Sequence, residues 1–585
     1  MACNRVEDRV SSAFGLPPVN PVRFEFCQSI PNGGVMLLLP FLIECGLLSY
    51  RTYYDQRSGY YTFDSLLITL AFFALLRIKS VEQSKGYNPG EFGKLIGFDR
   101  IPELKKLRGM IHELTRAGRC KDWGKSLSAK WIGEDKPELY YVDGHVQVYH
   151  GYLAELGKKF VSRQRLCLAG MTEFWVNSSK GLPFFFITAE VNEKMIEMLE
   201  DEIVPRLLEL HTISEEQGQK MAENPDYPRF TLVFDREAYS PALFKRLWEE
   251  HHIAVLTYRK NVKDQWEEAD FKEVDVDVRL GKTQMKLHEK AVVLDSYSMR
   301  EVRRLTSNGH QTSIITNNKF LTIALIACYM FGRWVQENFF RYLCQDYAFD
   351  RIIKYAVDQA DKTTMVVNRE YSNIQYEIKR CREKLNRIKA NIYKYQQNIL
   401  KENEHKKADE TDDKNDKNDK NKKADNWFKK TLELVEKAQS IEQELDRLIA
   451  KRKNTKYKIS LADIPENERY TKLHQESKYL MNIIIMICFR AETALAEKLA
   501  PHFSRSDDEI RALVKAITHL SIDMMPDMEN SLLNITLYPL SNHRSQNALA
   551  RVIDQVNDTQ TVYPGTNLVM KFKIATMRIA PSREV

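Results

Sequence analysis

The spacing of apolar residues changes several times along the chain, and each change predicts a different kind of structure. Residues 1–130 carry apolar runs and helical spacing, so we expect a mainly helical N-terminal region. From residue 131 onward, short strand-like runs alternate with helical segments, which indicates an α/β sheet. The strands are expected at 139–143, 165–177, 182–189, 230–234 and 253–258, and the helices at 192–211 and 241–251.

Residues 260–316 interrupt this core. Several of their segments alternate between apolar and polar residues with a period of two, which predicts an inserted antiparallel β region. A helix is expected again at 329–342. The α/β core with its β-rich insertion should therefore extend over residues 131–350.

The region beyond the core has a different pattern. Apolar residues recur in steps of three and four on both sides of a polar stretch, which predicts a coiled-coil hairpin over residues 366–455. Residues 401–425 hold no apolar residue except two alanines, so we expect a disordered tip there. Pairing of each arm with a second copy would leave the same sequence pattern. Residues 456–585 are expected to be a mainly helical region of unassigned role.

Composition narrows the class of protein. The 585 residues include 43% apolar residues, and 87 basic against 80 acidic side chains give a net charge of +7. Nine cysteines show no CxxC pair, which favours reduced thiols and a cytoplasmic protein. The apolar runs 66–76 and 480–489 are shorter than a membrane span of about 20 residues, so we expect buried core helices and no membrane.

The chain contains two clusters of basic residues although its net charge is small. Residues 98–130 hold nine basic and four acidic side chains, and residues 369–400 hold eight basic and three acidic ones. Each cluster is a candidate DNA-backbone surface, because phosphate contacts come from grouped Lys and Arg. A solvated face of an amphipathic helix explains the same pattern.

Three acidic residues stand at the ends of predicted elements or on one helix face. The strand 230–234 ends at Asp235, and the strand that begins at Leu139 ends at Asp143, followed by a glycine turn. Arg333, Glu337 and Arg341 recur every four residues, so they share one face of the helix 329–342. Three carboxylates that meet would repel one another, so the set makes sense only as a metal site.

This order of acidic residues resembles the DDE transposases, and most closely the insertion-sequence type that carries a Tyr, an Arg and a Glu on one helix. Those enzymes place two residues between the Tyr and the Arg, and a Lys seven residues after the Glu. Here three residues separate Tyr329 from Arg333, and Cys344 occupies the Lys position. The resemblance implies an RNase H-like mixed sheet that begins with three antiparallel strands, and a β-rich insertion that contacts the transposon end.

The resemblance also implies a mechanism. Asp143, Asp235 and Glu337 would hold Mg²⁺, for which Mn²⁺ could substitute, and would catalyse DNA strand cleavage and strand transfer. The resemblance places Arg333 against DNA phosphate. Arg341, His145 and Arg236 are further candidate DNA contacts because they lie near the three acidic residues in the sequence.

Two alternatives stay open at this level. A nuclease with the same fold but without strand transfer would carry the same triad, and a non-catalytic DNA-binding protein derived from a transposase could retain it. The expected partner is double-stranded DNA, both transposon ends and target. Concerted cutting and joining of two ends needs two active sites, so we expect a homo-oligomer on DNA.

Overall fold

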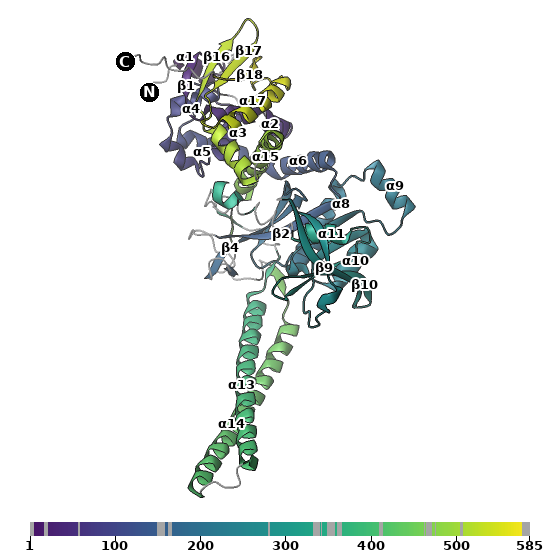
Figure 1. Ribbon diagram of the computed structural model, residues 1–585. Coiled ribbons are helices and arrows are strands. Elements are labelled where there is room, and N and C mark those ends of the chain that lie inside the picture. Colours follow the sequence, from purple (N-terminus) through teal and green to yellow (C-terminus); the bar gives the residue numbers. More distant parts are fainter. Residues whose placement is uncertain are drawn as a thin grey trace, which may run out of the picture. The chain divides into compact units, whose positions relative to one another are not determined.

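The computed structural model describes residues 5–16, 22–55, 59–148, 158–161, 166–278, 281–331, 340, 342–347, 357–359, 365–408, 414–460, 463, 471–473, 475–503 and 507–575. The chain forms two compact units (Figure 1). Unit 1 comprises Met1–Asp358 and Lys472–Val585, and unit 2 comprises Gln359–Thr471. Both ends of the chain therefore contribute to unit 1.

Five strands form the centre of the main sheet of unit 1. Their spatial order is β5-β4-β2-β6-β7. Their bounds are β2 (Leu139–Val148), β4 (Leu166–Ser178), β5 (Pro183–Glu190), β6 (Phe230–Phe234) and β7 (Ile253–Tyr258). β4 is antiparallel to β2 and to β5, whereas β2, β6 and β7 are mutually parallel. Of these five strands, only β4 runs in the opposite direction, and the predicted α/β sheet is confirmed.

The predicted β insertion widens this sheet. β11 (Gln311–Thr316) pairs antiparallel with β7, and β10 (Tyr297–Leu305), β9 (Gly281–Leu294) and β8 (Lys272–Val278) follow as an antiparallel meander. β3 (Lys158–Val161) pairs with the start of β4, which completes a ten-stranded sheet. The insertion is thus continuous with the core sheet, because β7 offers an edge on which β11 can pair.

Helices cover both faces of the central strands. Alternate residues of β2 belong to different apolar clusters: Tyr140 and Val142 pack on one side, while Leu139 and Tyr141 pack on the other. The first side is covered by α7 (Met195–Met198), α8 (Val204–Leu210) and α10 (Pro241–His251), and a π-helical turn (Leu199–Ile203) joins α7 to α8. The second side is covered by α11 (Ile323–Phe331).

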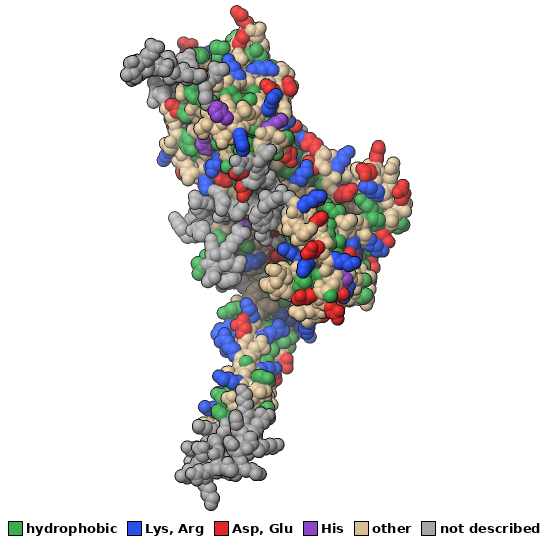
Figure 2. All heavy atoms as spheres, viewed as in Figure 1, with side chains coloured by type: hydrophobic (Ala, Val, Ile, Leu, Met, Phe, Trp, Pro, Cys, Tyr) green, Lys and Arg blue, Asp and Glu red, His purple; other side chains and the backbone are tan. Residues whose placement is uncertain are grey.

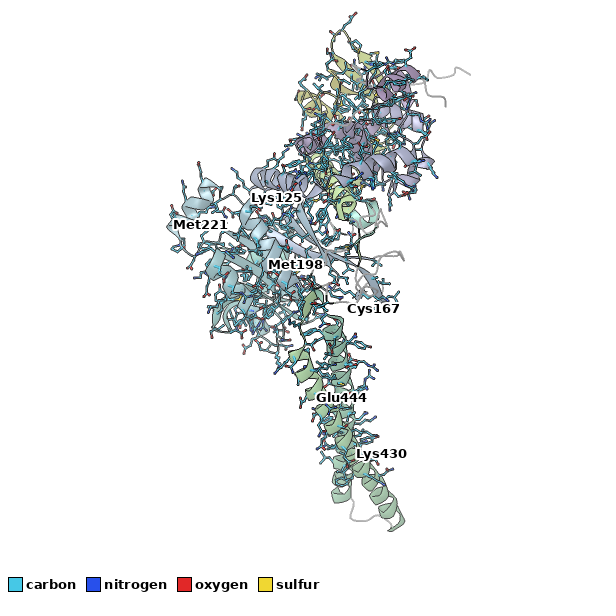
Figure 3. All side chains as sticks on the ribbon, turned by 180° about the vertical axis from the view of Figure 1, so that it is seen from behind. Lys125, Cys167, Met198, Met221, Lys430 and Glu444 are labelled. Carbon is cyan, nitrogen blue, oxygen red and sulfur yellow. The ribbon has the colours of Figure 1, made fainter. Side chains whose placement is uncertain are left out.

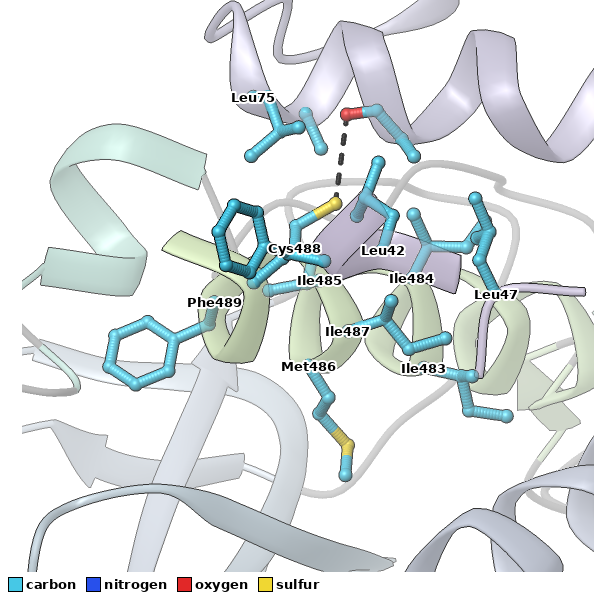
Figure 4. Close-up of a cluster of buried hydrophobic side chains, with 14 of the residues drawn as sticks. Leu42, Leu47, Leu75, Ile483, Ile484, Ile485, Met486, Ile487, Cys488 and Phe489 are labelled. Atoms are coloured by element: carbon cyan, nitrogen blue, oxygen red, sulfur yellow. Dashed lines mark hydrogen bonds between the residues drawn. The ribbon is translucent and has the colours of Figure 1, made fainter. Parts of the chain in front are cut away.

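The remainder of unit 1 is built mainly from helices. They are α1 (Val6–Ala13), α2 (Leu39–Glu44), α3 (Phe63–Leu75), α4 (Pro89–Leu95), α5 (Leu104–Arg116), α6 (Cys120–Asp135), α9 (Glu215–Glu223), α15 (Gln475–Leu499), α16 (Asp507–Thr518) and α17 (His543–Asp558). α15 packs against α2, α3, α5 and α6. Figure 4 shows its apolar side chains against Leu42, Leu47 and Leu75, with Cys488 Sγ 3.6 Å from the carbonyl oxygen of Ala71.

A second sheet joins the two ends of the chain. Its order is β1 (Cys27–Ile30), β16 (Ile522–Asp527), β17 (Leu532–Leu537) and β18 (Val569–Ile574). The predicted boundary between an N-terminal region and a separate region 456–585 is therefore wrong for this structure. The strand β1 pairs with β16, almost 500 residues away, and helices α2 and α3 pack on α15, about 400 or more residues away, which no local pattern reveals.

One helical segment among the described residues, Glu476–His502, is long and apolar enough to cross a membrane by length and composition. Within its 18-residue apolar window, 78% of the residues are buried inside the protein. Such burial is what a core helix requires, because its apolar surface is removed from water by neighbouring helices.

Unit 2 is a helical hairpin. α13 (Arg369–Ala408) and α14 (Lys414–Asn454) lie side by side and antiparallel (Figure 1), with ion pairs Lys389–Glu442 at 2.8 Å and Lys451–Glu370 at 3.0 Å. The seam buries Ile374, Ile378, Cys381, Leu385 and Ala438. Where the hairpin meets its connections, β13 (Met365–Val367) pairs with β14 (Lys458–Ser460). Short strands β12 (Val357–Gln359) and β15 (Thr471–Leu473) lie where the sequence enters and leaves unit 2.

The predicted disordered tip differs from the structure. α13 continues to Ala408 and α14 begins at Lys414, so most of residues 401–425 is helical. Residues 409–413 lie outside the described residues. Lys, Glu and Ala are favourable in helices, and a helix already nucleated by a packed seam extends at little cost. The lack of apolar residues in 401–425 therefore argues against burial of this stretch, but it does not argue against a helical backbone.

Candidate active site

Asp143 and Asp235 lie side by side on neighbouring strands. The parallel pairing of β2 with β6 ends at the pair Val142 and Phe234, so the two aspartates are the next residues on each strand. Neighbouring strands are about 4.8 Å apart, which places the two Cα atoms within easy reach of one shared ligand. Two acids separated by 92 positions in the sequence are thus brought together by strand register.

Both aspartate side chains project from the same sheet face. Tyr141 and Val233 precede them by two residues and pack in the cluster under α11. Because side chains alternate along a strand, Asp143 and Asp235 share that face. The face is bordered by the end of α11, since the Tyr141 hydroxyl donates to the carbonyl oxygen of Tyr329 at 2.8 Å.

The two carboxylates have similar local hydrogen bonds. Asp143 Oδ1 accepts from the backbone N–H of Gly144 at 2.9 Å, and Asp235 Oδ1 accepts from the backbone N–H of Arg236 at 2.6 Å. Asp235 also caps the short 3-10 turn Arg236–Ala238. Both residues are half-buried, and each carboxylate is oriented by a backbone N–H.

The prediction that Asp143 ends its strand is wrong. β2 continues to Val148, with Asp143 opposite Trp175 and His145 opposite Glu173 on β4. The Asp-Gly pair does not form a turn, because the thirteen-residue β4 supplies backbone partners beyond it. Asp143 is therefore held in the middle of a paired strand, which restricts it more than a strand end would.

His145 and Arg236 both contact aromatic rings. The His145 ring stacks on Phe340 with centroids 5.2 Å apart and an angle of 11° between the planes. His145 was expected to lie in a turn, and its position in β2 places it on the same face as Asp143. The exposed Arg236 lies with its guanidinium 5.4 Å from the centroid of the Tyr258 ring.

The remaining predicted site residues, Glu337, Arg333 and Arg341, lie outside the described residues. Tyr329, the first residue of the resembled helix motif, is half-buried, and burial raises the pKa of its hydroxyl. Phe340 is described, and besides stacking on His145 it makes an edge contact with Trp175 at 6.5 Å. Aromatic rings therefore line the sheet face next to Asp143.

The donor set was compared with what a divalent metal needs. Within the described part of the chain, no group of three or more His, Cys, Asp and Glu side chains comes together. Asp143 and Asp235 supply carboxylate oxygens, which hard cations such as Mg²⁺ prefer. The two aspartates fit as part of a Mg²⁺ site that needs a further acid.

Sequence analysis missed Glu173, a carboxylate that is 1% exposed on β4. It accepts from Gln147 Nε2 at 2.7 Å and from Asn482 Nδ2 at 2.9 Å, and Lys478 Nζ lies 3.8 Å away. Burial raises the pKa of this carboxyl, which the Lys478 charge partly offsets. The alternation of side chains along a strand predicts that Glu173 shares a sheet face with His145. The sequence does not predict the partners of Glu173 on α15, because they are about 300 residues away.

Ion pairs engage five of the nine basic residues in the predicted cluster 98–130. Lys125, labelled in Figure 3, lies 2.5 Å from Glu209, and other pairs join Arg100 to Glu103, Arg108 to Glu82, Arg119 to Asp122 and Lys130 to Glu134. Figure 2 shows basic and acidic side chains interspersed on the visible face of unit 1. This favours a solvated helix face over a dedicated DNA surface for most of the cluster.

Comparison with known proteins decides the family. Residues 1–576 match the family model described as "Transposase protein". The chain belongs to this transposase family. The predicted relationship to transposases is confirmed at the level of the family.

The transposase is also similar to a cryo-EM structure of a piggyBac transposase synaptic complex with hairpin DNA, with 11% sequence identity and a TM-score of 0.27. The match covers 48% of this chain and 59% of the piggyBac chain. Chains this different share too little for residues of one to be placed on the other. A comparison with curated proteins finds no match.

Proposed function

We propose that this protein is a DDE transposase of the insertion-sequence type, which cleaves DNA at transposon ends and transfers the freed strand through Asp143, Asp235 and Glu337. The observation that carries the proposal is the register of β2 and β6, which sets two aspartates side by side on one sheet face. Buried strands rarely place two like charges together unless a cation joins them.

The strand order supports an RNase H-like core. Of the five central strands, the antiparallel β2, β4 and β5 come first in the sequence, and the parallel strands β6 and β7 follow on the other side of β2. This is the arrangement that the sequence resemblance implies for such a core. In it, the first acid lies on the central strand and the second follows its parallel neighbour.

Chain connectivity supports Glu337 as the third acid. The carbonyl oxygen of Met330 accepts from Tyr258 at 3.3 Å, and Phe340 stacks on His145 at 5.2 Å. Glu337 is seven residues after the first of these anchors and three residues before the second. Three residues span at most about 11 Å at an upper limit of about 3.6 Å per residue, so we propose that Glu337 lies near Phe340 and the sheet face that carries Asp143.

In the proposed chemistry, the metal ions and the side chains of the protein have different roles. Bound Mg²⁺ would activate the attacking oxygen and stabilise the leaving oxygen of the phosphodiester. The three carboxylates would fix the ions relative to one another, and the backbone N–H groups of Gly144 and Arg236 would hold the aspartates in place. A 3′-hydroxyl freed by the first cleavage would be the nucleophile for strand transfer, so no nucleotide cofactor is needed.

DNA contacts would come from residues around the acids. Arg236, next to Asp235 and exposed, is the described residue best placed to meet a phosphate, and Arg333 and Arg341 are proposed from the resemblance. His145 would act chiefly by supporting the sheet face, because its ring already stacks on Phe340. The proposed partners are double-stranded transposon ends and target DNA, bound by a homo-oligomer.

Replacing Asp235 with Asn tests the proposal. Asn keeps the oxygen that accepts from Arg236 N–H but loses the charge that would bind the ion, so folding and DNA binding should persist. Cleavage of a duplex that carries the sequences flanking the coding region should fall by about 10³-fold or more, as expected when a metal-binding charge is lost. The measurement is strand cleavage and joining on denaturing gels, with DNA binding followed in parallel.

The matched control is Asp226→Asn, a half-exposed aspartate that is paired with Lys319 at 2.7 Å and lies before β6, at the opposite end of that strand from Asp235. It should cleave like the unaltered protein. Undiminished cleavage by Asp235→Asn would reject the site. Cleavage without any joined product would favour the nuclease alternative, and DNA binding without cleavage by the unaltered protein would favour the non-catalytic one.

A further inference from the structure

A polar cavity lies in unit 1 between α6, β5, α8 and α15. Its volume of about 370 Å³ is within the range of about 300 to 1,000 Å³ that is typical of small-molecule sites. The consecutive residues Phe185, Phe186 and Ile187 all line it, although neighbouring side chains of a strand point to opposite faces. Among the described strands β5 pairs only with β4, so the cavity lies at the free edge of β5.

The cavity is distinct from the two aspartates. Phe186 pairs with Trp175 on β4, and Trp175 pairs with Asp143 on β2, so the edge of β5 is two strands away from Asp143. The stacked rings of Trp175 and Phe186, with centroids 5.0 Å apart, lie between them. What the cavity binds can therefore be argued without reference to the proposed cleavage chemistry.

Arg206 on α8 marks this cavity as a site for an anion. Its half-buried side chain places the guanidinium 4.5 Å from the centroid of the Phe185 ring, and its Nε is buried without a hydrogen-bond acceptor. Burial lowers the pKa of this group, which the nearby charges of Glu202 and Glu209 only partly offset. Glu209 is itself paired with Lys125 at 2.5 Å. A cation removed from water without a partner costs stability, so a ligand is expected to supply the anion.

A second cation borders the same cavity. Lys121 on α6 has its Nζ 5.3 Å from the centroid of the Tyr479 ring, and within the described part of the chain it forms no ion pair. It is one of the four basic residues of the cluster 98–130 that the ion pairs leave unengaged. Two cations next to aromatic rings suit a phosphate that is attached to a planar ring.

Carboxylates at the cavity restrict the ligand further. Asp201 and Glu202 line it from the π-helical turn Leu199–Ile203, and neither forms an ion pair with another described residue. A third, Asp122, is paired with Arg119 at 3.2 Å. Ionised carboxylates only accept hydrogen bonds, so they disfavour a simple anion but suit the N–H groups of a nucleic-acid base. One ligand class, a nucleotide, satisfies both signs of charge.

We propose that this cavity binds a nucleoside monophosphate whose base carries an amino group, either free or at the 5′ end of a DNA strand. Arg206 and Lys121 bind the phosphate. Asp201 and Glu202 accept hydrogen bonds from the base, whose ring packs beside Tyr479. Since the ligand contacts α6, β5, α8 and α15 together, its binding stabilises the packing of these four elements.

Calorimetric titration of the full-length protein with GMP tests the site. GMP should bind at least tenfold more tightly than guanosine, which lacks the phosphate. Arg206→Met and Lys121→Ala should each lower the affinity for GMP about tenfold or more, because each removes a charged partner of the phosphate. The matched control is Lys105→Ala, an exposed lysine of the same basic cluster that does not line the cavity, which should bind GMP within about twofold of the unaltered protein.

Thermal unfolding separates ligand binding from a structural role of Arg206. Arg206→Met keeps an apolar contact with Phe185 and removes the unpartnered charge, so without ligand its melting temperature should equal or exceed that of the unaltered protein. Saturating GMP should raise the melting temperature of the unaltered protein but not that of Arg206→Met. A clear loss of stability in Arg206→Met, together with undiminished GMP binding by Lys121→Ala, would assign Arg206 a structural role and overturn the proposal.

A competition experiment identifies the source of the nucleotide. Displacement of GMP by a single-stranded oligonucleotide with a 5′-phosphorylated guanosine would assign the cavity to the end of a DNA strand, and no displacement would assign it to a free nucleotide. Failure of the unaltered protein to bind either GMP or AMP at millimolar concentration would overturn the proposal. Equal binding of GMP by the unaltered protein, Arg206→Met and Lys121→Ala would do the same.

Discussion

Single residues in this fold carry charges whose state depends on burial. His211 is 5% exposed and its Nδ1 lies 2.8 Å from the buried Tyr140 hydroxyl. Burial, together with the nearby charge of Arg229, lowers the pKa of His211 to about 4. The folded protein therefore holds this imidazole neutral over a pH range in which the unfolded chain would protonate it.

Stability should consequently fall on mild acidification. The unfolded chain takes up a proton at His211 below its usual pKa of about 6.5, whereas the folded protein does so only near pH 4, so the loss occurs between these values. We expect the free energy of unfolding in urea to fall more between pH 7.5 and pH 5 in the unaltered protein than in His211→Gln. The difference should reach up to about 2 kcal/mol, and equal pH dependence of both proteins would contradict it.

At the scale of elements, the contribution of residues 401–425 to the stability of unit 2 can be tested directly. The hairpin residues whose burial the structure describes, such as Ile378 and Leu385, lie outside residues 401–425, and that stretch contains no apolar residue except two alanines. Replacing 401–425 with a short Gly/Ser loop should therefore leave the melting temperature of unit 2 nearly unchanged, because little apolar burial is lost. Ile378→Ala provides the contrast, with an expected loss of about 2 to 5 kcal/mol. A large loss from the loop replacement would show that the tip itself stabilises the hairpin.

Elements also show where the sequence was informative. The strand that precedes Asp235 could be predicted because all five residues from Phe230 to Phe234 are apolar or β-branched, and all are buried. The strand through Asp143 was cut short in the prediction, since Asp-Gly is a strong turn signal that pairing with β4 overrides. The apolar seam between α13 and α14 could be predicted from the heptad spacing, because both arms repeat the same spacing over many turns.

At the scale of the whole molecule, the prediction with most consequence is assembly. A transposase that joins two ends in concert needs two active sites, so we expect two or more copies per pair of transposon ends. Mass in solution, measured with and without an end duplex, should rise accordingly. Binding should weaken steeply between 50 and 200 mM salt, because phosphate contacts release counterions. Strand transfer by a complex of one copy per duplex would refute this.

The arrangement of the whole molecule was the least predictable part. Nothing near Ser29 indicates that its backbone N–H will donate to Asp523, 494 residues away, at 2.8 Å. The contact between Glu492 and Arg77 is equally unpredictable from the local sequence, since the two residues are separated by 415 positions. Periodicity reports which face of an element is buried, but the choice of partner depends on packing that only the folded chain defines.

The sheet that joins β1 to β16, β17 and β18 has a consequence for synthesis of the protein. Its first strand leaves the ribosome early, but its last strand ends at Ile574. At about 5 to 20 residues per second, roughly 20 to 85 s pass between the synthesis of α3 and the completion of α15, on which α3 packs. Throughout that interval α3, almost wholly apolar, has no final packing surface. Newly made chains should therefore depend on chaperones, and copies of the gene truncated near the 3′ end should yield protein that is degraded.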